Sequence, residues 1–341
     1  MKRILLVFFL ISSVSFSQRL SGYVYDKANK EPLFGVSVYF DGTTIGTITD
    51  ENGFFSLSGR EGETSKSNYK LVISHLGYFD KQIKNVETSS KLEIFLNPKS
   101  ISLKGVTLKA DPFSREEKLK IFKDYFLGKT GLARYCKIKN VEDVYLYFDV
   151  DENILKADAD VPIYITNDFL GYELRYNLQD FFILFSRKTL DPKEVVYAFR
   201  SGTTFFVDKK GRNDYFEKRR SNIYDGSIKH FMIALYYKSW EQQGYVLRGR
   251  SGRKIKNNVD FYVSGGVNEK LVSFDKFLTV RHNRRSSLLE LRDPSFVVDR
   301  NGTISPPMAV IFKGYMGDLG LADALPDDYS PTINIDIGAK R

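Results

Sequence analysis

Residues 35–57 read GVSVYFDGTTIGTITDENGFFSL, and this stretch decides the fold of the N-terminal part of the chain. Val36, Val38 and Phe40 occur at every second position, which places them on one face of a strand because successive strand side chains point to opposite sides. The breaks at residues 41–42 and 50–53 contain Asp, Asn and Gly, which tolerate the positive φ that hairpin turns require. The pattern predicts a β-meander inside a small β-sandwich.

Further short strands on both sides complete this predicted sandwich. The alternation of apolar and polar residues predicts strands at residues 20–26, 69–75, 79–83 and 92–96, and Pro98 ends the series. Several short strands separated by regular turn signals are typical of a sandwich rather than of a parallel sheet. The region carries no pattern of side chains that indicates chemistry.

Five phrases in this region resemble the carboxypeptidase regulatory-like domain. They are Gly22-Tyr-Val-Tyr-Asp26, Pro32-Leu-Phe-Gly-Val36, Gly42-Thr-Thr-Ile-Gly-Thr-Ile-Thr-Asp50, Asn52-Gly-Phe54 and Ser74-His-Leu-Gly-Tyr78. The resemblance covers residues 18–98 and implies a transthyretin-like (prealbumin-like) β-sandwich that acts as a non-catalytic accessory module. Such modules occur in envelope proteins, including at the front of TonB-dependent outer-membrane receptors. We do not expect a complete receptor, because only residues 111–341 follow the module and its linker strand at 99–110.

The first 17 residues predict a cleaved signal peptide. Met1-Lys2-Arg3 is a short positive region, residues 4–14 are mainly apolar, and Ser15 and Ser17 are the small residues that a signal peptidase reads. The apolar run is shorter than the roughly 20 residues of a membrane-spanning helix. No cysteine follows the predicted cleavage site, so we do not expect a lipoprotein. We expect export to the periplasm, to the outer membrane surface or to the exterior.

Residues 111–341 predict a β-rich α+β domain with two amphipathic helices. Ser114 and Glu117 have the spacing of a capping box in front of the first helix. Ser227 precedes an apolar residue at 228 and others at helical spacing up to Tyr236, which predicts the second helix. Strands are expected at residues 144–150, 161–165, 172–176, 181–185, 195–199, 203–207, 245–247, 259–263, 271–280, 288–291 and 308–312. The predicted fold class is therefore mainly β: a transthyretin-like sandwich followed by this domain.

Four phrases of the second region resemble the C-terminal part of uncharacterised envelope proteins that carry the same N-terminal module. They are Phe126-Leu-Gly128, Leu170-Gly-Tyr172, Tyr224-Asp-Gly-Ser227 through His230-Phe231, and Leu325-Pro-Asp-Asp-Tyr329. That family has no assigned activity, so the resemblance implies no mechanism and no site residues.

Known catalytic motifs are missing from the sequence. The three histidines, His75, His230 and His282, lie far apart in the sequence, and none belongs to the H-E-x-x-H or H-x-x-E patterns of zinc peptidases. There is no G-x-S-x-G element. The single cysteine, Cys136, allows no internal disulfide and is interpreted as a small buried residue. We therefore expect no zinc-carboxypeptidase activity, no catalytic residues, no metal and no cofactor.

Positive charge is concentrated in the second region. Residues 99–341 hold 40 basic and 32 acidic residues, whereas residues 18–98 hold 9 and 10. The basic residues form three clusters, of which the first two give a candidate anion-binding surface. This surface comprises Lys209, Lys210, Arg212, Arg248, Arg250, Arg253 and Lys254; Lys218, Arg219, Arg220 and Lys256 extend the first two clusters, and Arg281, Arg284 and Arg285 form the third. In an exported protein the expected partner is an anionic lipid, a glycan or an acidic envelope protein rather than nucleic acid, and the alternative is a set of solvated loops.

Three functional hypotheses remain open at this point. The first is a non-enzymatic envelope protein that serves binding or assembly through folded surface. The second is an enzyme with an unrecognised site in residues 111–341, which a pocket that gathers histidines or carboxylates would favour. The third is a small outer-membrane barrel behind an accessory domain.

Overall fold

The computed structural model describes residues 20–57, 69–84, 86, 91–99, 111–211, 213–255, 262–264 (backbone) and 269–331. The chain divides into two compact units, Met1–Gly105 and Val106–Arg341. The predicted signal peptide, residues 100–110 of the predicted linker strand and Arg212 lie outside the described residues. Within the described part, no helix is long and apolar enough to cross a membrane.

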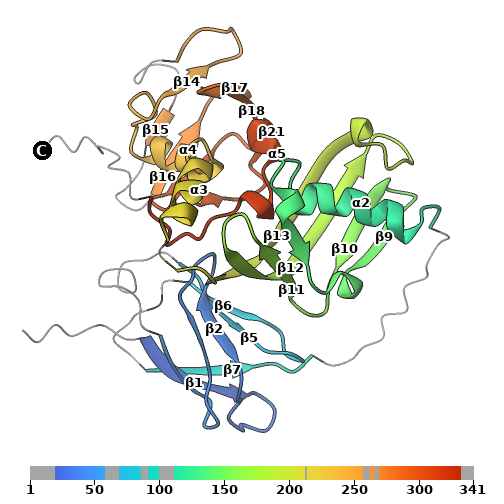
Figure 1. The fold of residues 1–341 in the computed structure, drawn as a ribbon, viewed down its shortest axis with the longest axis vertical. Helices are drawn as coiled ribbons and strands as arrows, with labels where there is room; N and C mark the ends of the chain where they lie inside the picture. Colours follow the sequence, from blue (N-terminus) through green and yellow to red (C-terminus); the bar gives the residue numbers. More distant parts are fainter. Residues whose placement is uncertain are drawn as a thin grey trace, which may run out of the picture. The chain divides into compact units, whose positions relative to one another are not determined.

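The first unit is a β-sandwich, as predicted (Figure 1). One sheet has the strand order β4-β1-β7 and the other β3-β2-β5-β6, and the apolar side chains between them form the core. The strands are β1 (Leu20–Asp26), β2 (Ser37–Phe40), β3 (Gly46–Ile48), β4 (Phe54–Leu57), β5 (Leu71–Ser74), β6 (Lys81–Ile83) and β7 (Leu92–Leu96). Val36, Val38 and Phe40 are all buried, which confirms the predicted inward face.

The predicted meander is wrong at its last strand. β2 pairs with β3, with Ser37 opposite Ile48, but β4 pairs with β1 in the other sheet, with Leu57 opposite Leu20. The change of sheet occurs at the turn of residues 50–53, in which the Asp50 carboxylate accepts hydrogen bonds from the main-chain N–H groups of Asn52 and Phe54. A hairpin signal describes a local turn, and it does not specify which strand the chain pairs with afterwards.

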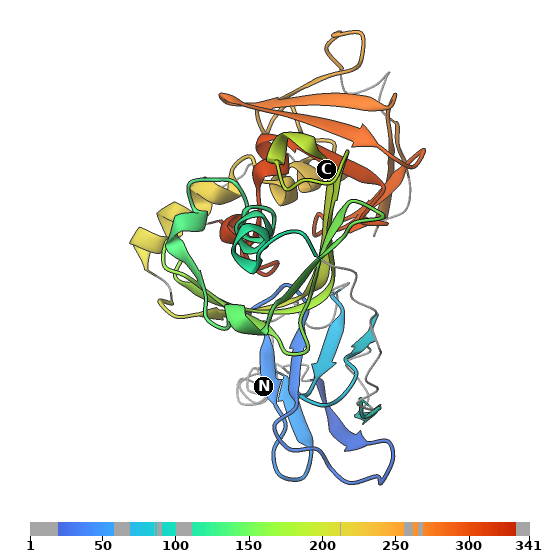
Figure 2. The ribbon, with the colours of Figure 1, turned by 90° about the vertical axis from the view of Figure 1, so that its right-hand side faces the viewer.

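The second unit begins with a helix held by a curved sheet, as Figure 2 shows. α2 (Arg115–Phe126) has the predicted capping box, because the Ser114 side chain accepts from the N–H of Glu117 while the Glu117 side chain accepts from the N–H of Ser114. The sheet has the order β8-β11-β12-β10-β9, and β13 also pairs with β12. Its strands are β8 (Cys136–Ile138), β9 (Tyr145–Asp149), β10 (Ile154–Asp158), β11 (Ile163–Asn167), β12 (Tyr172–Phe185) and β13 (Val195–Asp208).

Two long strands replace four predicted short ones in this sheet. β12 and β13 form one hairpin of two 14-residue strands, where the predicted strands stopped at residues 177–180 and 200–202. The register shifts between Leu178 and Asp180, so the chain forms a bulge there and not a turn. A bulge bends a strand without ending it. β10 was not predicted at all.

The rest of the second unit has two further helices and two four-stranded sheets around a second core. The helices are α3 (Asp214–Tyr224) and α4 (Ile228–Tyr236), and α5 (Tyr315–Asp318) is a short turn of helix. One sheet is β14-β17-β18-β21 and the other β15-β16-β19-β20. Their strands are β14 (Tyr245–Arg248), β15 (Tyr262–Ser264), β16 (Glu269–Ser273), β17 (Phe277–His282), β18 (Arg285–Leu291), β19 (Phe296–Asp299), β20 (Ile304–Ser305) and β21 (Val310–Gly314); the 3-10 helices of the unit are η1 (Ala133–Tyr135), η2 (Val141–Asp143), η3 (Pro192–Glu194) and η4 (Leu321–Asp323).

Local signals predicted α4 correctly but failed for α3 and for one strand. The Ser227 side chain accepts a hydrogen bond from the N–H of His230, which confirms the predicted helix start. α3 buries only Arg220 and Tyr224, so its sequence shows no apolar stripe. The predicted strand 271–280 is two strands in different sheets, β16 and β17. The mainly β fold class with α+β character in the second unit is nevertheless confirmed.

Candidate functional site

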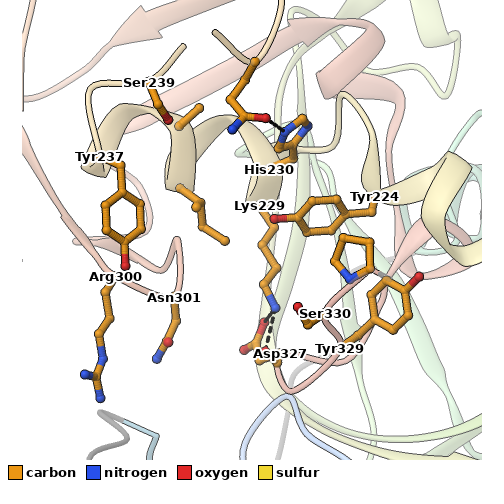
Figure 3. A pocket seen from close by; sticks show the side chains of 14 residues that line it. Tyr224, Lys229, His230, Tyr237, Ser239, Arg300, Asn301, Asp327, Tyr329 and Ser330 are labelled. Carbon is orange, nitrogen blue, oxygen red and sulfur yellow. Dashed lines mark hydrogen bonds and ion pairs between the residues drawn. The ribbon is translucent and has the colours of Figure 1, made fainter. Parts of the chain in front are cut away.

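The second unit contains a pocket of about 420 Å³ beside α4 (Figure 3). Tyr224 at the end of α3 and Lys229 and His230 in the first turn of α4 form one side. The C-terminal segment 327–331 forms another side, and the turn after β19 contributes Arg300 and Asn301. The volume lies in the range of roughly 300–1,000 Å³ that small-molecule sites occupy.

Hydrogen bonds, an ion pair and a ring contact hold the segment 326–329 against α3 and α4. The Lys229 ammonium group donates to the main-chain oxygens of Pro326 and Asp327 at 3.3 and 2.8 Å and lies 3.2 Å from the Asp327 carboxylate. The Tyr329 hydroxyl donates to the Glu217 carboxylate on α3 at 3.4 Å, and its ring lies against the ring of Tyr224. These contacts bring together two of the phrases that resemble the family of unknown activity, Tyr224–Phe231 and Leu325–Tyr329.

The opposite side of the pocket carries a cation without a fixed partner. Arg300 is half-buried and forms no ion pair or hydrogen bond within the part of the chain that the structure describes. Tyr237 and Asn301 lie near it (Figure 3). The charge of Lys229 is balanced by Asp327, so Arg300 gives the pocket lining a formal excess of one positive charge. An anionic group that entered the pocket would meet this guanidinium.

Next to the pocket, Asp225, His230 and His282 form a compact cluster. Asp225 is the C-terminal cap of α3, His230 lies in the first turn of α4, and His282 ends β17. Asp225 Oδ1 lies 2.7 Å from His282 Nε2 and 3.7 Å from His230 Nδ1. Both imidazoles are buried, whereas the Asp225 side chain is 47% exposed. The cluster therefore joins two helices to a sheet and still reaches solvent through its carboxylate.

The surroundings of His230 fix its tautomer. The main-chain N–H of Gly226 donates to Nδ1 at 3.1 Å, so Nδ1 is an acceptor and the hydrogen of the neutral ring is on Nε2. Nε2 then donates to the side-chain oxygen of Gln243 at 3.2 Å. Burial lowers the pKa of His230, although the Gln243 hydrogen bond and the Asp225 carboxylate act in the opposite direction. His230 is thus neutral at pH 7.

Two tyrosines complete the environment of the histidines. Tyr245 lies opposite His282 in the β14–β17 pair, and its hydroxyl is 3.0 Å from His230 Nδ1. Burial raises the pKa of Tyr245 well above its usual value and that of Tyr224 to about 12. Both hydroxyls remain protonated at neutral pH and act as hydrogen-bonding groups rather than as bases.

The structure brings two of the three histidines together and places the third in the other unit. His230 and His282 come together, with ring centroids 5.7 Å apart and planes at 90°, whereas His75 lies in the first unit. Asp225, Gln243 and Tyr245 were not predicted as site residues. The phrase Tyr224–Phe231 was the signal that pointed to this region, but it carries no spacing that a known metal or catalytic motif uses.

The described residues of the candidate anion-binding surface lie at the ends of strands from two different sheets and in the loops that follow them. Lys209 and Lys210 are exposed just after β13, and Lys209 lies 3.6 Å from the Glu173 carboxylate. Arg248, Arg250, Arg253 and Lys254 are exposed at the end of β14 and in the loop after it. Lys254 is paired with Glu241 at 3.3 Å, and Arg248 donates to a main-chain oxygen at 2.8 Å. Arg250 and Arg253 carry no such pairing among the described residues.

Arg220 does not belong to an exposed basic cluster, contrary to the prediction. Its side chain is 2% exposed and donates to both carboxylate oxygens of Asp208 at 3.0 Å. Its Nε donates to the main-chain oxygen of Leu170 at 2.9 Å, and the guanidinium lies 4.0 Å from the ring centre of Tyr172. Arg220 is a structural residue that ties α3 to the curved sheet.

Comparison with known proteins identifies the first unit. The family described as "CarboxypepD_reg-like domain" matches residues 20–108, so this part of the chain is a carboxypeptidase regulatory-like domain. Over 75 residues the chain is 36% identical to the TonB-dependent receptor SusC of Bacteroides thetaiotaomicron. The match covers 21% of this chain but only 7% of the receptor, so the shared part is one small domain of that protein.

Solved structures add little to this result. A cohesin–X-dockerin complex of Acetivibrio cellulolyticus shares 22% identity over 34% of this chain and 78% of that chain, with a TM-score of 0.20. A 9R-lipoxygenase of Cyanothece PCC8801 shares 12% identity over 64% of this chain and 48% of that chain, with a TM-score of 0.17. TM-scores this low support no statement about fold or function.

Proposed function

We propose that this protein is an exported, non-enzymatic protein of the cell envelope that binds a small anionic, hydroxyl-rich molecule in the pocket beside α4. The carboxypeptidase regulatory-like domain and its relation to a TonB-dependent receptor support a place in the envelope. The signal peptide predicted at residues 1–17 supports export. In this proposal the first unit is an accessory module, and the second unit carries the ligand site.

The observation that carries the proposal is the composition of the pocket lining. Arg300 supplies a cation without a partner among the described residues, Asn301 supplies an amide, and Tyr224, Tyr237 and Tyr329 supply rings and hydroxyls. Guanidinium groups bind phosphate and carboxylate through charge-assisted hydrogen bonds. Tyrosine combines apolar contact area with a polar tip, which suits a ring that bears hydroxyl groups. A phosphorylated or acidic sugar matches this combination.

The lining supports binding better than catalysis. His230 reaches the pocket, but its Nδ1 accepts the Gly226 N–H and its Nε2 donates to Gln243. His282 does not line the pocket, and its Nε2 is bound to Asp225. Nucleophilic catalysis requires a side chain within reach of a base that is ready to accept its proton. The sole cysteine, Cys136, lies in the other core of this unit.

The test is a binding titration of the purified protein with glucose 6-phosphate and, for comparison, with glucose. Titration calorimetry should show saturable binding of the phosphorylated sugar and much weaker binding of the neutral one. Arg300→Gln should weaken binding of the phosphorylated sugar by about 2 kcal/mol, or roughly thirtyfold in Kd, because a hydrogen bond to a charged group is lost. Lys120→Gln, which removes an exposed cation on α2, is the charge-matched control and should bind normally.

The same samples can contradict the proposal. Equal Kd values for Arg300→Gln and Lys120→Gln would show that the pocket does not select an anion. One observation favours an enzyme as the second candidate, namely the Asp225–His230–His282 cluster beside the pocket. Release of inorganic phosphate from the sugar phosphate, abolished by His230→Gln, would therefore favour an enzyme over a binding protein.

A further inference from the structure

We propose that Asp225, His230 and His282 bind a divalent first-row transition-metal ion, for which Zn²⁺ is the representative. The three donor atoms come from the end of α3, the start of α4 and the end of β17, and they lie within 4.8 Å of one another. Of the three proposed metal ligands, only His230 also lines the pocket beside α4.

The separations of the donor atoms fit a single small ion. Zinc binds imidazole nitrogen and carboxylate oxygen at about 2.0–2.2 Å, so two ligand atoms around a tetrahedral ion lie roughly 3.4 Å apart. Asp225 Oδ1 is 2.7 Å from His282 Nε2 and 3.7 Å from His230 Nδ1. The shorter separation is that of a hydrogen bond, in which a proton holds the two atoms together. If the ion replaced this proton, the hydrogen of the neutral His282 ring would be on Nδ1, and the three donor atoms, which lie within 4.8 Å of one another, would adjust to the tetrahedral spacing.

Two of the three ligands contact the kind of group that orients metal ligands in known sites. A metal-bound imidazole usually donates its other N–H to an oxygen, and this second contact fixes the tautomer. His230 has this arrangement, because its Nε2 donates to Gln243 and its Nδ1, 3.7 Å from Asp225 Oδ1, carries no hydrogen. Asp225 has it too, since its second oxygen accepts from the Asn283 side chain at 3.2 Å. His282 lacks it, because its Nδ1 is buried without a hydrogen-bond partner among the described residues, which counts against the site.

Two further features work against binding of the ion. The Gly226 N–H and the Tyr245 hydroxyl both approach His230 Nδ1, at 3.1 and 3.0 Å, and the ion must displace them. The Arg285 guanidinium donates to the main-chain oxygen of Asp225, so a positive charge lies close by. The Asp225 carboxylate offsets this charge, and its 47% exposure leaves a path from solvent and a coordination position for water.

The donor set selects the class of ion. Two imidazole nitrogens and one carboxylate oxygen suit zinc, copper, nickel and cobalt, whereas calcium and magnesium prefer ligands that are all oxygen. We therefore expect Zn²⁺ and Co²⁺ to bind and Mg²⁺ and Ca²⁺ to fail.

The experiment uses the untagged protein after treatment with a chelator. Calorimetric titration with Zn²⁺ should give one bound ion per chain, elemental analysis after dialysis should confirm it, and the Co²⁺ form should show the visible absorption of nitrogen and oxygen ligation. Asp225→Asn keeps an oxygen that accepts from His282 and removes the charge, so the variant should fold and lose affinity for Zn²⁺ by on the order of tenfold or more. His75→Gln alters the histidine of the first unit and is the matched control.

The Zn²⁺ titrations of these variants either support or overturn the proposed metal site. Loss of binding in Asp225→Asn and in His282→Gln, with retention in His75→Gln, supports the site. Absence of stoichiometric Zn²⁺ in the unaltered protein, or equal affinity in Asp225→Asn, overturns it and leaves a hydrogen-bonded histidine–carboxylate cluster. Titration of Asp225→Asn with glucose 6-phosphate keeps this result separate from the proposed function, because Arg300 is intact in that variant.

Discussion

Replacement of Arg220 by methionine is the sharpest test of how the second unit is held together. Methionine keeps much of the apolar contact with the Tyr172 ring but removes both hydrogen bonds to Asp208 and the one to the Leu170 oxygen. Removal of one partner from a buried ion pair typically costs about 3–5 kcal/mol. The Asp208 side chain is 28% exposed and keeps main-chain hydrogen bonds, so we expect the low end, about 3 kcal/mol.

The assay can follow the second unit alone. Trp240 is the only tryptophan of the chain and is buried in a core of this unit, so its fluorescence reports unfolding there and not in the sandwich. A loss of about 3 kcal/mol should lower the melting temperature by roughly 6–12 °C for a unit of the size of Val106–Arg341. Lys218→Met, which changes an exposed residue on the same helix, should stay within about 0.5 kcal/mol of the unaltered protein.

The effect of Arg220→Met also has a defined pH dependence. Burial acts to raise the pKa of Asp208, but the Arg220 guanidinium and the N–H groups of Lys210 and Gly211 outweigh it and hold the pKa below its usual value. The stabilisation is therefore complete above the unfolded-state pKa of about 3.9 and is lost as the pH falls through the lower folded-state pKa. The gap between variant and unaltered protein should shrink in this acid range. Equal stability of Arg220→Met and Lys218→Met at pH 7 would refute the reasoning.

Three further predictions concern other parts of the second unit. Gly128→Ala should destabilise the unit by about 2–4 kcal/mol, because φ of Gly128 is +102° and a Cβ there would lie 2.6 Å from a main-chain nitrogen. Gly131→Ala, which has open space around it, should leave the melting temperature unchanged in the same assay. Burial raises the pKa of the Cys136 thiol to about 12, so alkylation at pH 8 followed by mass spectrometry should be slow in the native protein and fast in urea; rapid native alkylation would contradict this. The double variant Arg250→Glu/Arg253→Glu should sediment less with vesicles of phosphatidylglycerol at low salt, by about 1 kcal/mol per basic residue lost, and equal sedimentation with neutral phosphatidylcholine vesicles would contradict the anion-binding surface.

Features that depend on a few neighbouring residues could be predicted from the sequence. The capping box of Ser114 and Glu117, the helix start at Ser227 and the inward face of Val36, Val38 and Phe40 are all present as expected. Caps, turns and strand alternation are satisfied within about four residues of chain, so they leave a pattern that can be read locally. The phrases of the carboxypeptidase regulatory-like domain belong to the same class of information.

Only the tertiary structure decided which distant residues meet. β4 and β2 belong to different sheets, Arg220 is buried against Asp208, and Asp225 is hydrogen-bonded to His282, 57 residues further along the chain. Each of these contacts depends on strand pairing and helix packing, which bring together elements that carry no local mark of one another. The sequence does not show whether a carboxylate or an imidazole is solvated or part of a cluster, because the fold determines which distant residue lies next to it.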